Sequence, residues 1–191
     1  MKFIAAISAL FALKVLANPL AIAPRVSVID PIVLKWEIDA ENGEVIVVDG
    51  TIENVIHHLQ QRGLPSSDTL QKRIPPLDMT GTHYFCGGRW EPASLSTMYS
   101  GLTYLNTVKG RVHVPRGPSS CGRVSCDWGS SIYICNDNTY PLTLDTFDRI
   151  VEAASYIISK CTVHASFVDV SGQLFFPDNW NVIIRRDAST C

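Results

Sequence analysis

DTFDRIVEAASYIISKC, residues 145–161, carries the clearest helical pattern in the chain. Its apolar side chains recur at intervals of three and four residues, as on the buried face of a helix; they are Phe147, Ile150, Val151, Ala154, Ile157, Ile158 and Cys161. Asp145 is the predicted N-cap, because an acidic group suits the positive end of the helix dipole. Cys161 falls on the buried face at the helix end, so a disulfide there would tie the helix to a sheet.

The segments around this helix predict strands and a second helix. Residues 123–126 and 131–135 flank a Gly-containing turn, and the second of them is apolar on both faces, as a central strand is. Three further segments have strand patterns: 167–170, 172–176 and 180–185. A helix is predicted to open at Glu91-Pro92, with a core stripe of Leu95, Met98, Tyr99, Leu102 and Leu105. We therefore expect an α+β fold: an antiparallel sheet with two helices packed on one face, a disulfide-stabilised two-layer sandwich.

The cysteines predict a disulfide framework. There are six: Cys86, Cys121, Cys126, Cys135, Cys161 and Cys191. Their separations match no zinc-binding template, so neither a metal nor another cofactor is expected. An even number in an oxidising compartment predicts three disulfides, whose pairing stays open because six cysteines allow 15 connectivities.

The N-terminus has the pattern of a secretory signal peptide. Met1-Lys2 is followed by an apolar run that Lys14 interrupts. Val15-Leu16-Ala17 then places small or medium residues at the −3 and −1 positions of a signal-peptidase cut after Ala17. The run is too short to span a bilayer, and no later stretch predicts a membrane span. The alternative is a buried N-terminal helix. Residues 1–17 as a signal peptide predict a secreted, extracellular protein.

Composition limits the classes of partner. The chain has 191 residues, 46% of them hydrophobic and 18% charged, which is typical of a globular protein. Sixteen Lys and Arg against 18 Asp and Glu leave no basic excess, so no nucleic-acid partner is expected. We expect a monomer whose target is an unknown component of a host or of another microbe.

A dibasic pair divides the chain. Lys72-Arg73 follows a polar stretch and resembles a kexin-type processing site, and all six cysteines lie beyond it. Residues 18–73 would then be a propeptide and residues 74–191 a cysteine-rich domain. The alternative is a solvated pair in a loop, since 32–38 and 44–48 read as a hairpin. A helix with Ile52, Val55, Ile56 and Leu59 on its apolar face follows, so the segment is either a folding-assisting prosegment or a permanent part of the fold.

The sequence brings no catalytic constellation together. There is no G-x-S-x-G, P-loop or H-E-x-x-H motif. A ribonuclease would need His with Glu or a second His near Arg, and spacing does not unite the available groups: His83, His113, His164, Glu91 and Glu152. No catalytic residue is assigned. The oxygen-rich segments 136–138 and 178–179 fit turns better than calcium loops.

Tryptophans offer a candidate binding residue. Trp90, Trp128 and Trp180 could each serve as an exposed platform. Trp128 is preferred because hairpin turns seldom bury a large ring. A ring folded back over a small core is the alternative.

Several segments together resemble a family of small cysteine-rich secreted proteins of filamentous fungi. They are Cys121-Gly-Arg-Val-Ser-Cys126, Ile132-Tyr-Ile-Cys135-Asn-Asp-Asn138, the helix from Ile150 to Cys161, Gly172-Gln173, and Asp178-Asn-Trp-Asn-Val-Ile-Ile184. The resemblance covers about residues 83–191, and more loosely the pattern is similar to the killer-toxin-like α/β sandwich. It implies a candidate effector that acts on a host or a competing microbe, outside or later inside a host cell. It supplies no catalytic residues, and the segment 26–62 departs from the family pattern.

We therefore expect a secreted effector or toxin-like protein that acts by binding. One alternative is a small secreted hydrolase such as a ribonuclease. Another is an antimicrobial or structural surface protein.

Overall fold

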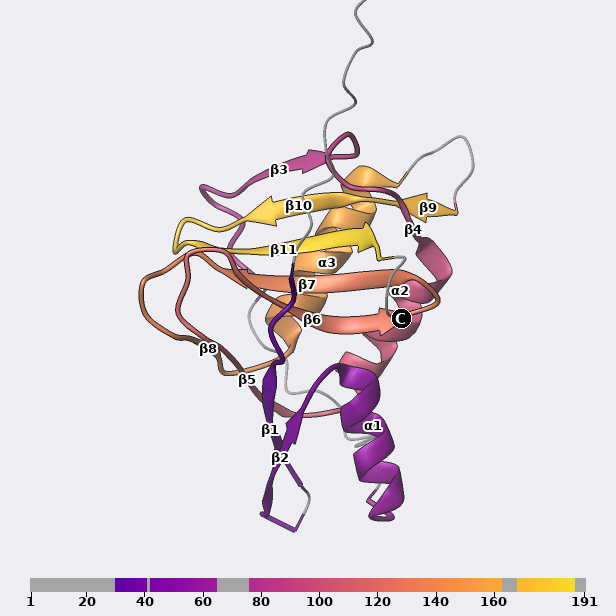
Figure 1. Cartoon of the computed structure of the whole chain (residues 1–191), viewed down its shortest axis with the longest axis vertical. Helices are drawn as coiled ribbons and strands as arrows, with labels where there is room; N and C mark the ends of the chain where they lie inside the picture. Colours follow the sequence, from indigo (N-terminus) through magenta and orange to yellow (C-terminus); the bar gives the residue numbers. More distant parts are fainter. Residues whose placement is uncertain (1–29, 41, 65–75, 163–167, 188–191) are drawn as a thin grey trace, which may run out of the picture.

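The computed structural model describes residues 30–40, 42–64, 76–162 and 168–187 (Figure 1). The elements in chain order are β1 (Lys35–Asp39), β2 (Val45–Asp49), α1 (Ile52–Gln61), β3 (His83–Cys86), β4 (Ala93–Ser94), α2 (Leu95–Asn106), β5 (Gly110–Val114), β6 (Ser120–Asp127), β7 (Ser130–Asn136), β8 (Leu142–Leu144), α3 (Asp148–Cys161), β9 (Asp169–Val170), β10 (Gly172–Phe175) and β11 (Trp180–Arg186). The pairs between these strands are antiparallel, which confirms the α+β class.

A five-stranded sheet in the order β3-β10-β11-β7-β6 forms the centre of the fold. β7 lies inside this sheet, and every one of its residues is buried. Ile132 and Ile134 belong to the main hydrophobic core, whereas Tyr133 belongs to a second cluster. The prediction of a central strand covered on both faces is confirmed, because both sets of alternating side chains find apolar neighbours.

Two helices pack against this sheet. α3 contacts β3, β10 and β11, while α2 contacts β6, β7 and α3. α3 begins at Asp148 rather than near Asp145, and its first turn is held by Thr146, whose hydroxyl bonds the Asp148 carboxylate at 2.8 Å. α2 begins at Leu95 rather than at Glu91-Pro92, because residues 93–94 pair with β9 as strand β4. The prediction that Tyr99 belongs to the buried face of α2 is wrong, because its side chain is exposed.

A second sheet, in the order β2-β1-β5-β8, joins the N-terminal hairpin to the cysteine-rich part (Figure 1). The hairpin itself lies close to its predicted position, and the predicted helix is α1. β1 pairs with β5 in a register that places Trp36 opposite Val112. The apolar residues of β1, β2 and α1 share the main core with those of α2 and α3. The prediction of one sheet in the cysteine-rich part is incomplete, because the predicted N-terminal hairpin joins β5 and β8 in a second sheet.

Two glycines in the cysteine-rich part show how closely the N-terminal segment is seated. Gly110 has a φ of +147°, and a Cβ atom there would lie 1.9 Å from the Glu37 carbonyl oxygen. A Cβ on Gly122 would lie 2.3 Å from the Leu34 side chain. Both positions need glycine because β1 and the residues before it approach the backbone directly.

One disulfide ties a helix to the five-stranded sheet, and another joins two neighbouring strands of that sheet. Cys86–Cys161 joins the end of β3 to the end of α3, which confirms that a disulfide at Cys161 ties the helix to the sheet. Cys121–Cys135 joins residues that face each other across β6 and β7. The described cysteines include no free thiol, whereas Cys191 lies outside the described residues. Within the described ranges, no helix is long and apolar enough to cross a membrane.

Candidate functional site

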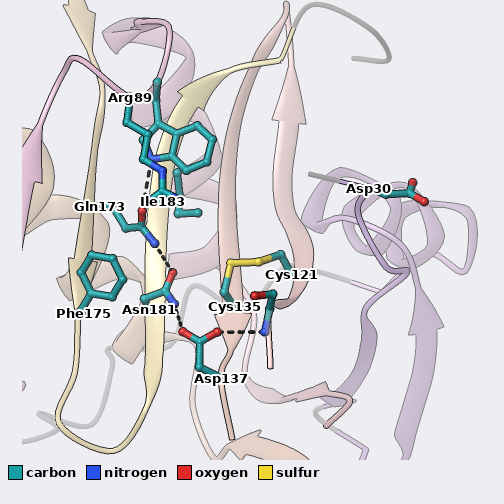
Figure 2. A pocket seen from close by; sticks show the side chains of 11 residues that line it. Asp30, Arg89, Cys121, Cys135, Asp137, Gln173, Phe175, Asn181 and Ile183 are labelled. Atoms are coloured by element: carbon teal, nitrogen blue, oxygen red, sulfur yellow. Dashed lines mark hydrogen bonds between the residues drawn. A yellow bond between two sulfur atoms is a disulfide. The ribbon is translucent and has the colours of Figure 1, made fainter. Parts of the chain in front are cut away.

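A cavity of about 480 Å³ opens on the five-stranded sheet (Figure 2). Its lining residues come from β10, β11, the start of β6, the end of β7 and nearby loops; they are Asp30, Arg89, Trp90, Ser119, Cys121, Cys135, Asp137, Gln173, Phe175, Asn181 and Ile183. Most apolar residues of this wall belong to the second cluster, which consists of Trp90, Cys121, Tyr133, Cys135 and Ile183; Phe175 lines the cavity outside that cluster. The side chains that alternate with them along the same strands, such as Ile134 and Val182, belong to the main core.

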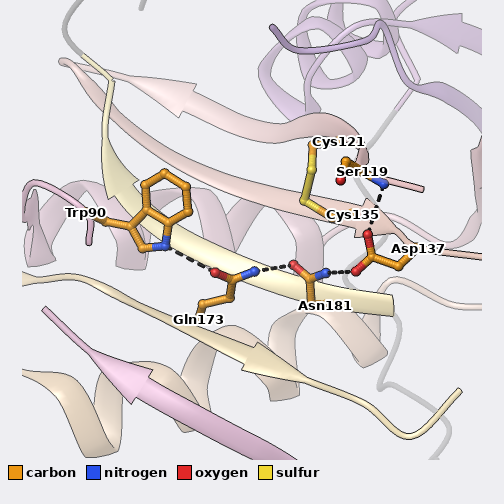
Figure 3. The surroundings of a disulfide bond; sticks show 7 residues. All are labelled: Trp90, Ser119, Cys121, Cys135, Asp137, Gln173 and Asn181. Carbon is orange, nitrogen blue, oxygen red and sulfur yellow. Dashed lines mark hydrogen bonds between the residues drawn. A yellow bond between two sulfur atoms is a disulfide. The ribbon is translucent and has the colours of Figure 1, made fainter. Parts of the chain in front are cut away.

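Four side chains form a hydrogen-bonded row along the cavity (Figure 3). The Trp90 indole donates from Nε1 to Gln173 Oε1 over 3.3 Å, and Gln173 Nε2 donates to Asn181 Oδ1 over 2.8 Å. Asn181 Nδ2 then donates to Asp137 Oδ2 over 2.8 Å. The other carboxylate oxygen of Asp137 accepts from the backbone N–H of Ser119 over 2.9 Å. All the hydrogen bonds of the row point the same way. The row begins at the Trp90 indole, which can only donate, and ends at the Asp137 carboxylate, which accepts.

Arginine side chains lie against Trp90. The guanidinium of Arg89 lies 5.2 Å from the centre of the indole, and that of Arg185 lies 5.1 Å from it. Arg89 is exposed at the cavity, whereas Arg185 is buried and also lies 5.6 Å from the Tyr133 ring. These cation–π contacts fix the position of Trp90 and place one accessible positive charge at the cavity.

Buried amides hold the loops around the cavity in place. Asn136 donates from Nδ2 to the carbonyl oxygens of Pro115 and Tyr140 over 3.0 and 2.8 Å. Asn138 donates to the carbonyl oxygens of Asp178 and Asn179 over 2.9 and 3.2 Å. The two oxygen-rich segments therefore bond to the backbone of neighbouring turns.

A buried charged group lies close to the second cluster. Arg123 Nε lies 2.8 Å from Asp187 Oδ2, and the Tyr133 hydroxyl donates to the same carboxylate oxygen. Burial alone would raise the pKa of Asp187, but the Tyr133 hydrogen bond and the positive charge of Arg123 outweigh it and lower that pKa below its ordinary value. Burial and the hydrogen bond to Asp187 raise the pKa of Tyr133, so its hydroxyl stays a donor.

The four-stranded sheet places a histidine beside a carboxylate. His113 Nε2 lies 3.1 Å from Glu37 Oε1, and Arg111 Nε lies 3.2 Å from Glu37 Oε2. Both nitrogens are buried, and these ion-pair contacts lack hydrogen-bond alignment. His113 Nδ1 lies 2.9 Å from the Thr143 hydroxyl. His113 also lines a cavity of about 370 Å³ with Lys35 and others. Sequence analysis missed this group because Glu37 lies in the segment assigned to a propeptide.

The other predicted site residues are scattered. His83 stacks on Phe175 with ring centroids 4.6 Å apart, and Glu152 accepts the backbone N–H of Leu77 over 2.9 Å. Glu91 is exposed. Ala17, Lys72, Arg73 and His164 lie outside the described residues.

The tryptophans differ sharply in exposure. Trp180 is buried and stacks on Phe176 with ring centroids 3.9 Å apart, and Trp90 is buried in the cavity wall. Trp128 is 85% exposed at the tip of the β6–β7 hairpin, with a φ of +45° that is rare for a bulky residue. The geometry therefore leaves Trp128 accessible to a partner.

Sequence analysis also missed the cavity itself. Gln173 and Asn181 are buried polar residues within apolar strands, and that contrast is the one signal the sequence offered. Among the residues that the structure describes, no group of three or more His, Cys, Asp or Glu side chains could hold a metal ion. Comparisons with known protein families, curated proteins and solved structures found no match, so the function must be argued from geometry.

Proposed function

We propose that this chain is a secreted, effector-like protein that acts by binding a component of a host or of a competing microbe. The observation that carries the proposal is the cavity on the five-stranded sheet, whose polar side chains are fixed in a row by hydrogen bonds to one another. Sites that bind small molecules combine a concave surface with a few fixed polar groups. A preordered row also lowers the entropic cost of binding.

The finer arrangement of the fold belongs to the same proposal. In a two-layer sandwich, α2 and α3 would cover one face of the five-stranded sheet and leave the other for the ligand. Support comes from the separation of Ile134 and Val182 from Tyr133 and Ile183 into different clusters. Exposed Trp128 would add a second contact for a large partner.

Secretion is supported by the signal-peptide pattern and by the disulfides Cys86–Cys161 and Cys121–Cys135, since disulfides form and persist in oxidising compartments. Intact mass of protein recovered from the culture medium, reduced and non-reduced, tests both predicted cuts and the number of disulfides. A mass that still includes residues 1–17 would contradict the prediction that they are a signal peptide removed on export.

Binding is tested with fluorescently labelled protein applied to host and microbial cell surfaces. Gln173→Met removes the centre of the hydrogen-bonding row and Arg89→Gln removes the exposed charge, while Ser155→Ala changes an exposed position on α3. We expect both cavity variants to lose surface binding and the α3 variant to retain it. If the wild type binds nothing, or if all variants bind equally, the proposal fails.

The His113 group favours a second candidate, a small secreted hydrolase such as a ribonuclease. An imidazole with a hydroxyl on one side and a carboxylate on the other can accept and return a proton, and Arg111 supplies a positive charge beside it. Incubation with RNA and with cell-wall polysaccharides tests it. His113→Ala should abolish any hydrolysis, whereas His57→Ala, on the exposed side of α1, should not. A wild-type protein without hydrolytic activity rejects this candidate.

A further inference from the structure

The hydrogen-bonding row in the cavity has a fixed polarity. The Trp90 indole can only donate and an ionised carboxylate at Asp137 can only accept, so the amides of Gln173 and Asn181 between them are held in one orientation. Each amide nitrogen uses one hydrogen within the row and has a second one. Each amide oxygen likewise accepts one bond within the row and has a second lone pair. The wall therefore offers two neighbouring amides, those of Gln173 and Asn181, and each provides an N–H donor next to a carbonyl acceptor.

Neighbouring hydroxyl groups match such a wall. A hydroxyl both donates and accepts, so two adjacent hydroxyls on a sugar ring can each bond an amide N–H and an amide or carboxylate oxygen. The half-buried ring of Phe175 also lines the cavity. His83 stacks on one of its faces, and the rest of the ring provides an apolar surface for the C–H face of a sugar. The volume of about 480 Å³ lies within the range of small-ligand sites.

Arg89 adds a charge requirement. Its guanidinium carbon lies 5.2 Å from the centre of the Trp90 ring and 6.0 Å from that of Phe85. A guanidinium also carries N–H donors that match a planar acceptor such as a carboxylate. No carboxylate among the described residues forms an ion pair with it. Asp137 lies at the opposite end of the row (Figure 2). Asp30, the other carboxylate of the lining, lies apart from Arg89 and from the row (Figure 2). The end of the cavity at Arg89 thus favours a carboxylate, and the end at Asp137 favours hydroxyls.

We propose that the cavity binds a hexuronate unit of an acidic polysaccharide. This inference rests on the proposed binding function and names its ligand class. The carboxylate of one uronate unit pairs with Arg89, and the hydroxyls of that unit and of the next one along the chain bond Gln173, Asn181 and Asp137.

The test is isothermal titration of the intact, oxidised protein with trigalacturonate and with a neutral trisaccharide, maltotriose. We expect trigalacturonate to bind at least ten-fold more tightly, the size of one charge-assisted hydrogen bond. Arg89→Gln should remove this preference while the protein still melts in one cooperative transition, because Arg89 is exposed. Arg186→Gln is the matched control, since Arg186 is also exposed but does not line the cavity.

The outcomes separate this ligand class from the proposed function. Loss of trigalacturonate binding in Arg89→Gln alone supports the uronate. Equal or tighter binding of maltotriose, or of a sugar phosphate used as a third probe, overturns the uronate while leaving a binding cavity. An unchanged affinity in Arg89→Gln also overturns it. By contrast, the proposed function fails if the wild type attaches to no cell surface or if the cavity variants leave that attachment unchanged.

Discussion

Replacing Trp36 with alanine tests whether residues 30–64 belong to the folded core. The indole is fully buried, lies edge-on to the Phe147 ring with centroids 5.1 Å apart, and donates from Nε1 to the Gly50 carbonyl oxygen over 2.8 Å. Removing such a ring from a packed core costs about 3–5 kcal/mol, and the lost hydrogen bond adds to this cost. At about 2–4 °C per kcal/mol, the melting temperature should fall by about 10 °C.

The assay is a thermal melt of the oxidised protein followed by near-ultraviolet circular dichroism, which reports aromatic packing throughout the chain. Val47→Ala is the control, since Val47 is 55% exposed on β2 and its truncation should cost less than about 0.5 kcal/mol. We expect one transition that moves down only in Trp36→Ala. A main transition that stays within about 2 °C of the wild-type value would refute the reasoning, because the hairpin would then be an appendage to an independently stable domain.

Four further outcomes follow from the same contacts. Cutting after Arg73 with a kexin-type protease should leave two chains that co-elute on gel filtration, because a shared core holds them; elution of the cysteine-rich chain alone would contradict this. Replacing both cysteines of Cys86–Cys161, 75 residues apart, should cost about 4.5 kcal/mol in denaturant unfolding, against about 3 kcal/mol for Cys121–Cys135, 14 apart; the reverse order would contradict loop-closure entropy as the cause. Trp128→Asn should raise stability by about 0.5–1 kcal/mol in the same assay, because asparagine tolerates the positive φ better, yet weaken surface binding if the ring contacts a partner. The lowered pKa of Asp187 means that the unfolded chain binds its proton first, so stability should fall as pH drops below about 4 in acid titrations; Asp187→Asn should lower stability at neutral pH and flatten this acid slope.

Local patterns predicted the parts of the fold whose side chains repeat with a clear period. The apolar face of α3 and the doubly apolar strand β7 are of this kind, and both lie where the sequence placed them. The start of α2 could not be predicted, because residues 93–94 form strand β4 only when β9 is there to pair with them. Tyr99 fits the helical period but faces solvent, since amphipathic spacing does not show how wide the covered stripe is.

The cavity could not be predicted because its contacts are distant in sequence. The hydrogen bond between Trp90 and Gln173 joins residues 83 positions apart, and the one between Asn181 and Asp137 joins residues 44 apart. Neither pair forms a motif with fixed spacing. Buried polar residues in apolar strands show that partners must exist, but not which ones.

The processing question and the binding question turn out to be connected. Asp30 lines the cavity, the backbone N–H of Ile32 donates to the Cys121 carbonyl oxygen over 2.9 Å, and Leu34 packs on Gly122. Cys121 is itself part of the cavity wall. Loss of residues 30–64 would therefore uncover the main core and remove support from one side of the cavity at the same time. A propeptide that is cut at Lys72-Arg73 and then discarded is hard to reconcile with a cavity that works in this form, whereas a cut segment that stays bound keeps both. Ligand affinity measured before and after the cut consequently tests both ideas, since only a retained segment leaves that affinity unchanged.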